Sequence, residues 1–147
     1  MAGKTIWTIM MDNCLPEHGP HNRHFWFAKH LKDRGYNPVV FVASRERGNA
    51  IQMIEDDEPF KVDDSYGFPF VYIRIKDYGE SMKKRVLAIF EFHKRLNKYA
   101  DTFVEMFGKP DVILGSNGYP LSPWLANRFA KKYDAASICE ICDLWPL

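Results

Sequence analysis

The sequence predicts an α/β domain built on an open, doubly wound, Rossmann-like parallel sheet. Short, unbroken apolar runs alternate with longer segments whose apolar residues recur every three or four positions. Runs of the first kind are typical of strands that are buried on both faces of a parallel sheet. Segments of the second kind predict the helices that cover such a sheet. The predicted strands span residues 6–11, 39–43, 70–75, 111–115 and 137–141.

Three helices are expected between these strands, and punctuating residues mark their ends. Asn22 suits the N-cap of the first helix and Gly35 the position that follows it. The longest helix ends at Gly108, and Ser122 with the next proline suits the start of the third. The stretch 44–68 is polar and acidic, which indicates an irregular excursion. The predicted helices span residues 22–34, 82–107 and 122–133. The predicted buried face of the longest helix consists of Val86, Phe90, His93, Leu96, Ala100, Phe103 and Phe107.

The composition excludes several classes of protein. Hydrophobic residues make up 46% and charged residues 27% of the chain, as in ordinary globular domains. A net charge of +1 gives no electrostatic reason to expect binding to nucleic acid. No apolar run approaches the roughly 20 residues that cross a bilayer. With three cysteines and no signal-peptide pattern, we expect a cytoplasmic protein without a disulfide framework.

The loops that leave the carboxyl ends of the predicted strands are the expected place of a binding site. Open parallel sheets bind ligands beyond these ends, close to the point where the strand order reverses. Three such loops, at residues 12–21, 116–120 and 142–146, carry polar groups or glycines. We therefore expect these distant segments to meet in one crevice, although fold class alone names no reaction.

The same loops resemble those of family 4 glycosyltransferases. The similar segments are 16–24 (PEHGPHNRH) with 27–36 (FAKHLKDRGY), 111–116 (DVILGS) and 140–146 (EICDLWP). In that family a glycine-containing loop precedes the first helix, and the last segment is similar to glu-val-arg-asp-leu-trp-pro. Residues from 78 to 92 are also similar to a motif of the fucosaminyltransferase-like subgroup, which acts in O-antigen and capsule assembly.

The resemblance implies the N-terminal, acceptor-side domain of a two-domain GT-B enzyme that retains anomeric configuration. Such enzymes move a sugar from a nucleotide-sugar donor to a lipid-linked saccharide of a bacterial surface polysaccharide, usually without a metal or other cofactor. The family's donor-binding domain, with its paired-glutamate motif, has no counterpart within the 147 residues. We therefore expect residues 1–147 to be the acceptor half of a longer enzyme and to be inactive alone.

The first loop supplies candidates for contact with an anionic ligand. Gly19 is expected either to let the backbone approach a diphosphate or to serve a turn, and the family has two glycines here. Arg23, in the first helical turn, either binds an anionic group or is a solvated surface residue. His18 and His21 either exchange protons near a reacting hydroxyl or are ordinary loop histidines.

The later loops supply candidates for contact with the acceptor. Ser116, Asn117 and Tyr119 both donate and accept hydrogen bonds, which suits sugar hydroxyls, although turn chemistry also selects such residues. Asp143 is the candidate catalytic residue, which would orient or deprotonate an acceptor hydroxyl; capping of the next turn is its structural alternative. Cys142 stands where the family has an arginine, so a cation that could pair with Asp143 is missing.

The C-x-x-C pattern of Cys139 and Cys142 could indicate a redox or zinc site. It runs through the end of a predicted strand, where residues three apart face opposite sides. Further zinc ligands are scarce in the sequence. We therefore predict buried structural cysteines and no metal site.

Basic residues border the apolar face of the longest predicted helix. Such a face could rest on anionic lipid at the inner face of the cell membrane, or it could be the solvated side of a core helix. The residues are Lys83, Lys84, Arg85, Lys94, Arg95 and Lys98.

Two other functions fit the same sequence. The chain could be a stand-alone flavodoxin-like binding domain, or the acceptor subunit of a transferase split over two chains. Neither alternative includes a donor-binding domain on the same chain, which the resemblance implies.

Overall fold

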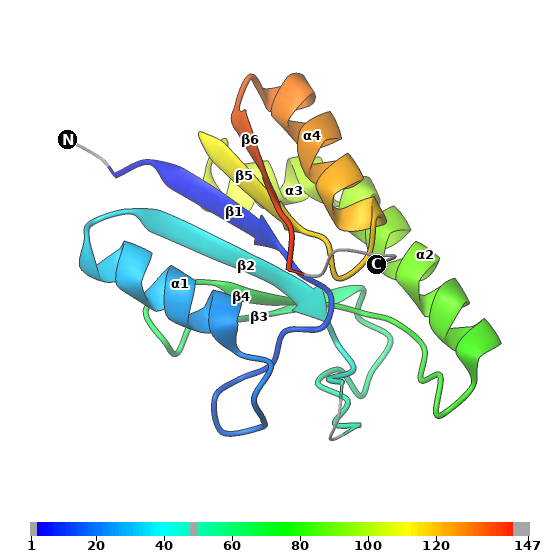
Figure 1. Cartoon of the computed structure of the whole chain (residues 1–147). Helices are drawn as coiled ribbons and strands as arrows, with labels where there is room; N and C mark the ends of the chain where they lie inside the picture. The colour runs from blue at the N-terminus through cyan, green and yellow to red at the C-terminus, as the bar shows by residue number, and fades with distance from the viewer. Residues whose placement is uncertain (1–2, 48–49, 143–147) are drawn as a thin grey trace.

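The computed structural model describes residues 3–47 and 50–142, and within them a six-stranded sheet runs in the order β3-β4-β2-β1-β5-β6 (Figure 1). The strands are β1 (Thr5–Ile9), β2 (Asn37–Ala43), β3 (Phe60–Asp63), β4 (Phe70–Ile73), β5 (Val112–Ser116) and β6 (Ala136–Glu140). The helices are α1 (Arg23–Asp33), α2 (Met82–Lys98), α3 (Ala100–Phe107) and α4 (Leu121–Tyr133). The predicted open α/β fold is confirmed.

The strand order is that of a Rossmann-like sheet. Only β3 is antiparallel to its neighbour; the other pairs are parallel. Counted among the parallel strands in chain order, the sheet reads 3-2-1-4-5, whereas flavodoxin-like sheets read 2-1-3-4-5. The order reverses at β1, which pairs with β2 on one side and β5 on the other.

Helices cover the two faces of the sheet unequally. The larger core packs α2, α3 and α4 against one face, and its centre holds the fully buried rings of Trp7, Phe41 and Phe103 (Figure 1). On the other face α1 covers β2 and β4. Beside α1, over β1, β5 and β6, lies an open apolar hollow of about 540 Å³. As a result β6 is mostly exposed, with Ile138 48% accessible, although the sequence predicted a buried strand.

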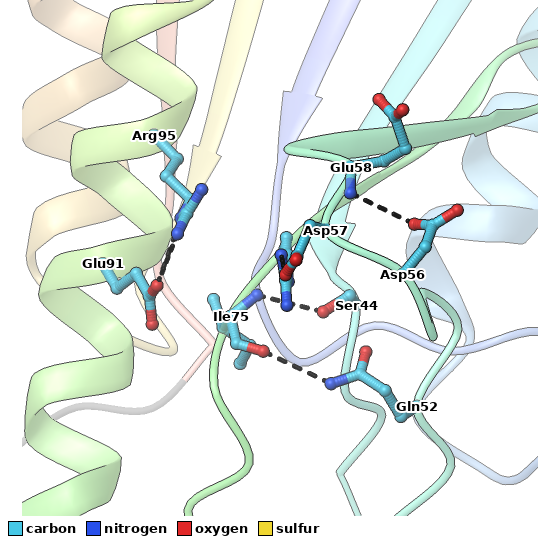
Figure 2. Close-up of polar contacts among 9 residues, drawn as sticks. Ser44, Gln52, Asp56, Asp57, Glu58, Ile75, Glu91 and Arg95 are labelled. Atoms are coloured by element: carbon cyan, nitrogen blue, oxygen red, sulfur yellow. Dashed lines mark hydrogen bonds and ion pairs between the residues drawn. The ribbon is translucent and has the colours of Figure 1, made fainter.

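The excursion after β2 is more ordered than the sequence indicated. It contains β3, which pairs with β4 and forms that edge of the sheet. The hydroxyl of Ser44 accepts a hydrogen bond from the backbone N–H of Ile75 at 3.0 Å, and the Gln52 amide donates to the Ile75 carbonyl at 3.3 Å (Figure 2). These bonds attach both ends of the first part of the excursion to the chain that follows β4.

The longest predicted helix is two helices. Helix α2 ends at Lys98, because the next residue, Tyr99, has a ψ of 9° that departs from helical geometry, and α3 follows directly. No proline or glycine marks this break, so apolar spacing alone suggested one continuous helix. The predicted buried face was also wrong in its first turns, because Val86 is 47% and Phe90 58% exposed. Helix α2 buries Ala88 and Phe92, which were not predicted, together with His93 and Leu96, whose predicted burial is confirmed.

The start of α4 also differs from the prediction. The helix begins at Leu121 after Pro120, so Ser122 is not its N-cap. The Ser122 hydroxyl is fully buried and lies 2.9 Å from Nε2 of His93 on α2. This bond joins the two helices. In the described ranges, no helix is both long and apolar enough to cross a membrane.

Candidate functional site

A cavity of about 330 Å³ opens at the carboxyl ends of β1, β5 and β6. It lies where the strand order reverses, which is the expected place for a ligand in an open α/β sheet. The loop after β1, the loop after β5 and the residues after β6 meet here, as the sequence predicted. The excursion after β2 adds a fourth segment. The lining residues are Met10, Asp12, Asn13, Pro20, His21, Arg23, His24, Arg47, Gly118 and Cys142.

The carboxylate of Asp12 is the centre of one polar cluster in this cavity. It follows β1 and is 5% exposed. Its Oδ2 accepts hydrogen bonds from the Tyr119 hydroxyl at 2.7 Å and from Nη1 of Arg47 at 3.2 Å. Nη2 of Arg85 lies 3.6 Å from the same oxygen. The Tyr119 hydroxyl also accepts from Nε of Arg85 at 3.1 Å. Helix α2 is therefore connected to the cavity through Arg85 and Tyr119.

A second cluster joins the start of α1 to the end of β6. Glu140 accepts from Nη2 of Arg23 at 3.0 Å and from Nε2 of the buried His24 at 2.6 Å. The same Nη2 donates to Sγ of Cys142 at 2.6 Å, and the Ser116 hydroxyl lies 3.1 Å from that sulfur. Arg23 thus brings a cation to the position beside Cys142, where the sequence indicated that one was missing.

The pKa values of this second cluster define its charges near neutral pH. Burial lowers the pKa of His24 despite its bond to Glu140, so the imidazole is neutral and donates from Nε2. Burial opposes ionisation of Glu140, but hydrogen bonds from Ser116 and His24 and the charge of Arg23 outweigh burial and lower its pKa. Glu140 is therefore an anion that holds Arg23 in place.

The pKa of Tyr119 reinforces the donor role of its hydroxyl in the first cluster. Burial and the neighbouring Asp12 carboxylate raise this pKa to about 12. The phenol therefore keeps its proton and donates it to Asp12.

Two further donor groups lie at this cavity: the side-chain amide of Asn13, which is among the lining residues, and the first backbone N–H groups of α1. The Asn13 side chain is 2% exposed, and its Nδ2 makes no hydrogen bond within the described residues. The side chain of Asn22 does not cap α1 and instead donates to the Gly19 carbonyl at 2.7 Å. The first N–H groups of α1 point out of the helix beside Arg23, where an anion is favoured.

The structure brings only some of the predicted site residues into the cavity. His21 and Arg23 line it, and Tyr119 reaches it through Asp12. Gly19 lies outside the lining and accepts the Asn22 bond instead. Asp143, the predicted catalytic residue, lies outside the described residues.

Ser116 and Asn117 support the loops around the cavity. Ser116 is fully buried at the end of β5. The Asn117 side-chain carbonyl accepts a hydrogen bond from the backbone N–H of Cys142 at 2.7 Å. The backbone N–H of Asn117 donates to the backbone carbonyl of Glu140 at 3.0 Å. His18 lies 2.8 Å from the buried Glu46, away from the lining. These bonds hold the loop after β5 against the end of β6.

Sequence reasoning missed Asp12, Asn13, His24 and Arg47. The first two directly follow β1 and could have been found by their strand-end position. Arg47 belongs to the excursion after β2, which the sequence analysis left without a role. His24 was overlooked because a histidine in a helix carries no signal without its partner, which is 116 residues away.

The cysteines do not form a site of their own. Cys139 is exposed, contrary to the predicted burial, and Cys142 is half-buried beside Arg23. All three cysteines are free. Over residues 3–47 and 50–142, no group of three or more His, Cys, Asp or Glu side chains is placed to hold a metal ion.

The lining of the cavity has the chemical groups that an anionic, hydroxyl-rich ligand requires. Among the described residues, the guanidinium groups of Arg23 and Arg47 line the cavity together with the Asn13 amide and the Asp12 carboxylate, and such groups suit anions and sugar hydroxyls. Compared with models of known protein families and with curated protein sequences, the chain gives no match.

Proposed function

We propose that this chain is the acceptor-side domain of a glycosyltransferase and that its cavity binds the phosphate-bearing part of a sugar substrate. The observation that supports the proposal is the orphan Asn13 amide, which lines the cavity together with Arg23 and Arg47. A buried donor without an acceptor costs about 1–3 kcal/mol, and a ligand oxygen recovers that cost. Guanidinium groups and a helix N-terminus are the protein groups that favour phosphate oxygens.

The proposed reaction combines this geometry with the sequence resemblance. A sugar is moved, with retention, from a nucleotide donor to a lipid-linked saccharide of a surface polysaccharide. In this scheme Arg23 and Arg47 neutralise phosphate charge, and Asn13 and His21 orient hydroxyls. Asp12 and Glu140 hold the arginines in position. Most donor contacts come from a separate donor-binding domain, whether on the same chain or on a partner chain.

Ligand binding is the first test. UDP represents the donor and geranyl diphosphate the lipid-linked acceptor, and both are titrated into the protein while amide resonances are recorded. We expect shifts at the lining residues. Arg23→Gln and Asn13→Ala should each weaken binding about tenfold or more, as expected for the loss of one charge-assisted or buried hydrogen bond.

The matched control is Arg128→Gln, an exposed arginine on α4 outside the lining. This variant should bind both diphosphates as the wild type does. The support for a phosphate site would be removed if the amide resonances that shift belonged only to residues outside the lining. An equal loss of binding in the control variant would have the same consequence.

Transfer itself is tested in cells of the source organism. Deletion of the gene should abolish incorporation of labelled sugar into solvent-extractable lipid, and the wild-type gene should restore it. A gene carrying both Arg23→Gln and Asn13→Ala should not. Binding of a diphosphate without any change in labelled lipid would favour the plain binding domain over the transferase.

A further inference from the structure

Helix α2 carries a second apolar face that nothing in the described structure covers. Met82 is 67%, Val86 47%, Leu87 67% and Phe90 58% exposed, and we name these four residues the α2 stripe. Residues are about 100° apart around a helix, so Leu87 and Phe90 lie on the side away from the buried Phe92. Met82 and Val86 lie at the border between this side and the buried face. Four large apolar side chains gathered on one helix are uncommon on a free surface.

Lysines accompany the α2 stripe on the same helix. Lys83, Lys84 and Lys94 are all exposed, and Lys83 and Lys94 lie on the arc that also carries Leu87 and Phe90. The helix has one acidic residue, Glu91, whose charge is paired with Arg95 at 2.9 Å. An exposed apolar stripe flanked by lysines that make no ion pair with the described carboxylates is complementary to a bilayer surface with anionic headgroups.

The position of the α2 stripe relates it to the cavity. The first turns of α2 project past the arrowheads of the strands, at the end of the sheet where the cavity opens (Figure 1). Arg85 lies between Lys84 and Val86 and bonds Tyr119, which in turn bonds Asp12 in the cavity. The helix that carries the α2 stripe therefore also contacts the polar cluster of the cavity.

We propose that the α2 stripe and its lysines dock this chain on the surface of an anionic lipid bilayer. Phe90, Leu87 and Met82 enter the boundary between headgroups and acyl chains, and Lys83, Lys84 and Lys94 contact lipid phosphates. The helix lies on the membrane and does not cross it. This inference does not depend on the proposed transferase activity, because it concerns a different surface and requires no sugar substrate.

Vesicle cosedimentation tests the proposal with the whole chain. The wild type should bind vesicles of equimolar phosphatidylglycerol and phosphatidylcholine at least about tenfold more tightly than vesicles of phosphatidylcholine alone, because each lysine near an anionic surface adds attraction. Leu87→Ser with Phe90→Ser, and separately Lys83→Gln with Lys84→Gln, should each lower binding by about tenfold or more. All four positions are exposed, so the circular dichroism spectrum and the melting temperature should stay near those of the wild type.

The controls carry the same chemical changes elsewhere. Met106→Ser with Ile138→Ser removes two exposed apolar side chains, and Lys109→Gln removes an exposed charge, all away from α2. These variants should bind anionic vesicles like the wild type. Equal binding to both kinds of vesicle, or an equal loss in the controls, would overturn the proposal. Absence of vesicle binding would also overturn the proposal. If the wild type then forms dimers that Leu87→Ser with Phe90→Ser converts to monomers, a second copy of the chain covers the α2 stripe.

Discussion

Gly115 offers a sharp test of how β5 and α4 pack beneath the cavity. A Cβ atom at this position would lie 2.6 Å from the Ser122 carbonyl oxygen and 2.7 Å from Cα of Pro123. Both are backbone atoms, so neither can rotate away. Overpacking of this kind costs about 1–3 kcal/mol when side chains can yield, and we expect Gly115→Ala to lower the free energy of unfolding by about 3 kcal/mol.

The matched control is Gly118→Ala in the following loop. A Cβ there would meet the flexible end of Met10 at 3.1 Å, so the expected loss is within about 1 kcal/mol. Urea denaturation followed by circular dichroism measures both variants. If Gly115→Ala were no less stable than Gly118→Ala, the close approach of β5 to α4 would be wrong. The position of the loop that contributes Gly118 to the cavity would then be wrong as well.

Other predictions concern the core and the charged clusters. Phe103→Ala should cost about 3–5 kcal/mol in urea denaturation, because the ring is fully buried between Phe41 and Phe60; a loss below 1 kcal/mol would contradict that burial. The pKa values of His24 and His93 are lowered by burial, so the unfolded state binds more protons below about pH 6.5 and thermal stability should fall as the pH decreases from there. A melting temperature that does not change between neutral pH and about pH 5 would argue against two neutral buried imidazoles. Glu140→Gln should destabilise the chain by about 1–3 kcal/mol at neutral pH. Because the pKa of Glu140 is lowered, this difference from the wild type should vanish only well below pH 4.5, and its persistence there would point to a role other than charge.

The fold was largely predictable because each parallel strand is a short apolar run set between turn residues. The prediction failed where the apolar pattern of the sequence does not match the burial of the side chains in the structure. β3 is a four-residue strand within an acidic segment, and its pairing with β4 is a long-range event that leaves little local pattern. Apolar spacing on α2 could not distinguish Phe92, which faces the sheet, from Phe90, which faces away.

The location of the cavity was predictable from the sequence, but only some of its lining residues were. Strand-end loops identify the edge where a ligand binds, and that reasoning correctly brought residues 12–21 and 116–120 together with Cys142. It could not assign contacts that depend on side-chain direction. The Asn117 side chain bonds the backbone of Cys142, whereas Asn13 is one of the residues that line the cavity, and nothing in the sequence separates these two strand-end asparagines.

The place of β1 in the middle of the sheet has a consequence for the order of folding. β1 can pair with β2 soon after both are synthesised, but its other neighbour, β5, follows much later: Thr5 and Asp111, bonded to each other, are 106 residues apart. Closure of such a long loop is slow, and the chain emerges from the ribosome over several seconds. A nascent chain therefore holds half a sheet before β5 arrives. Because the cavity needs residues from both halves, ligand affinity should appear abruptly once the residues up to Cys142 have been synthesised.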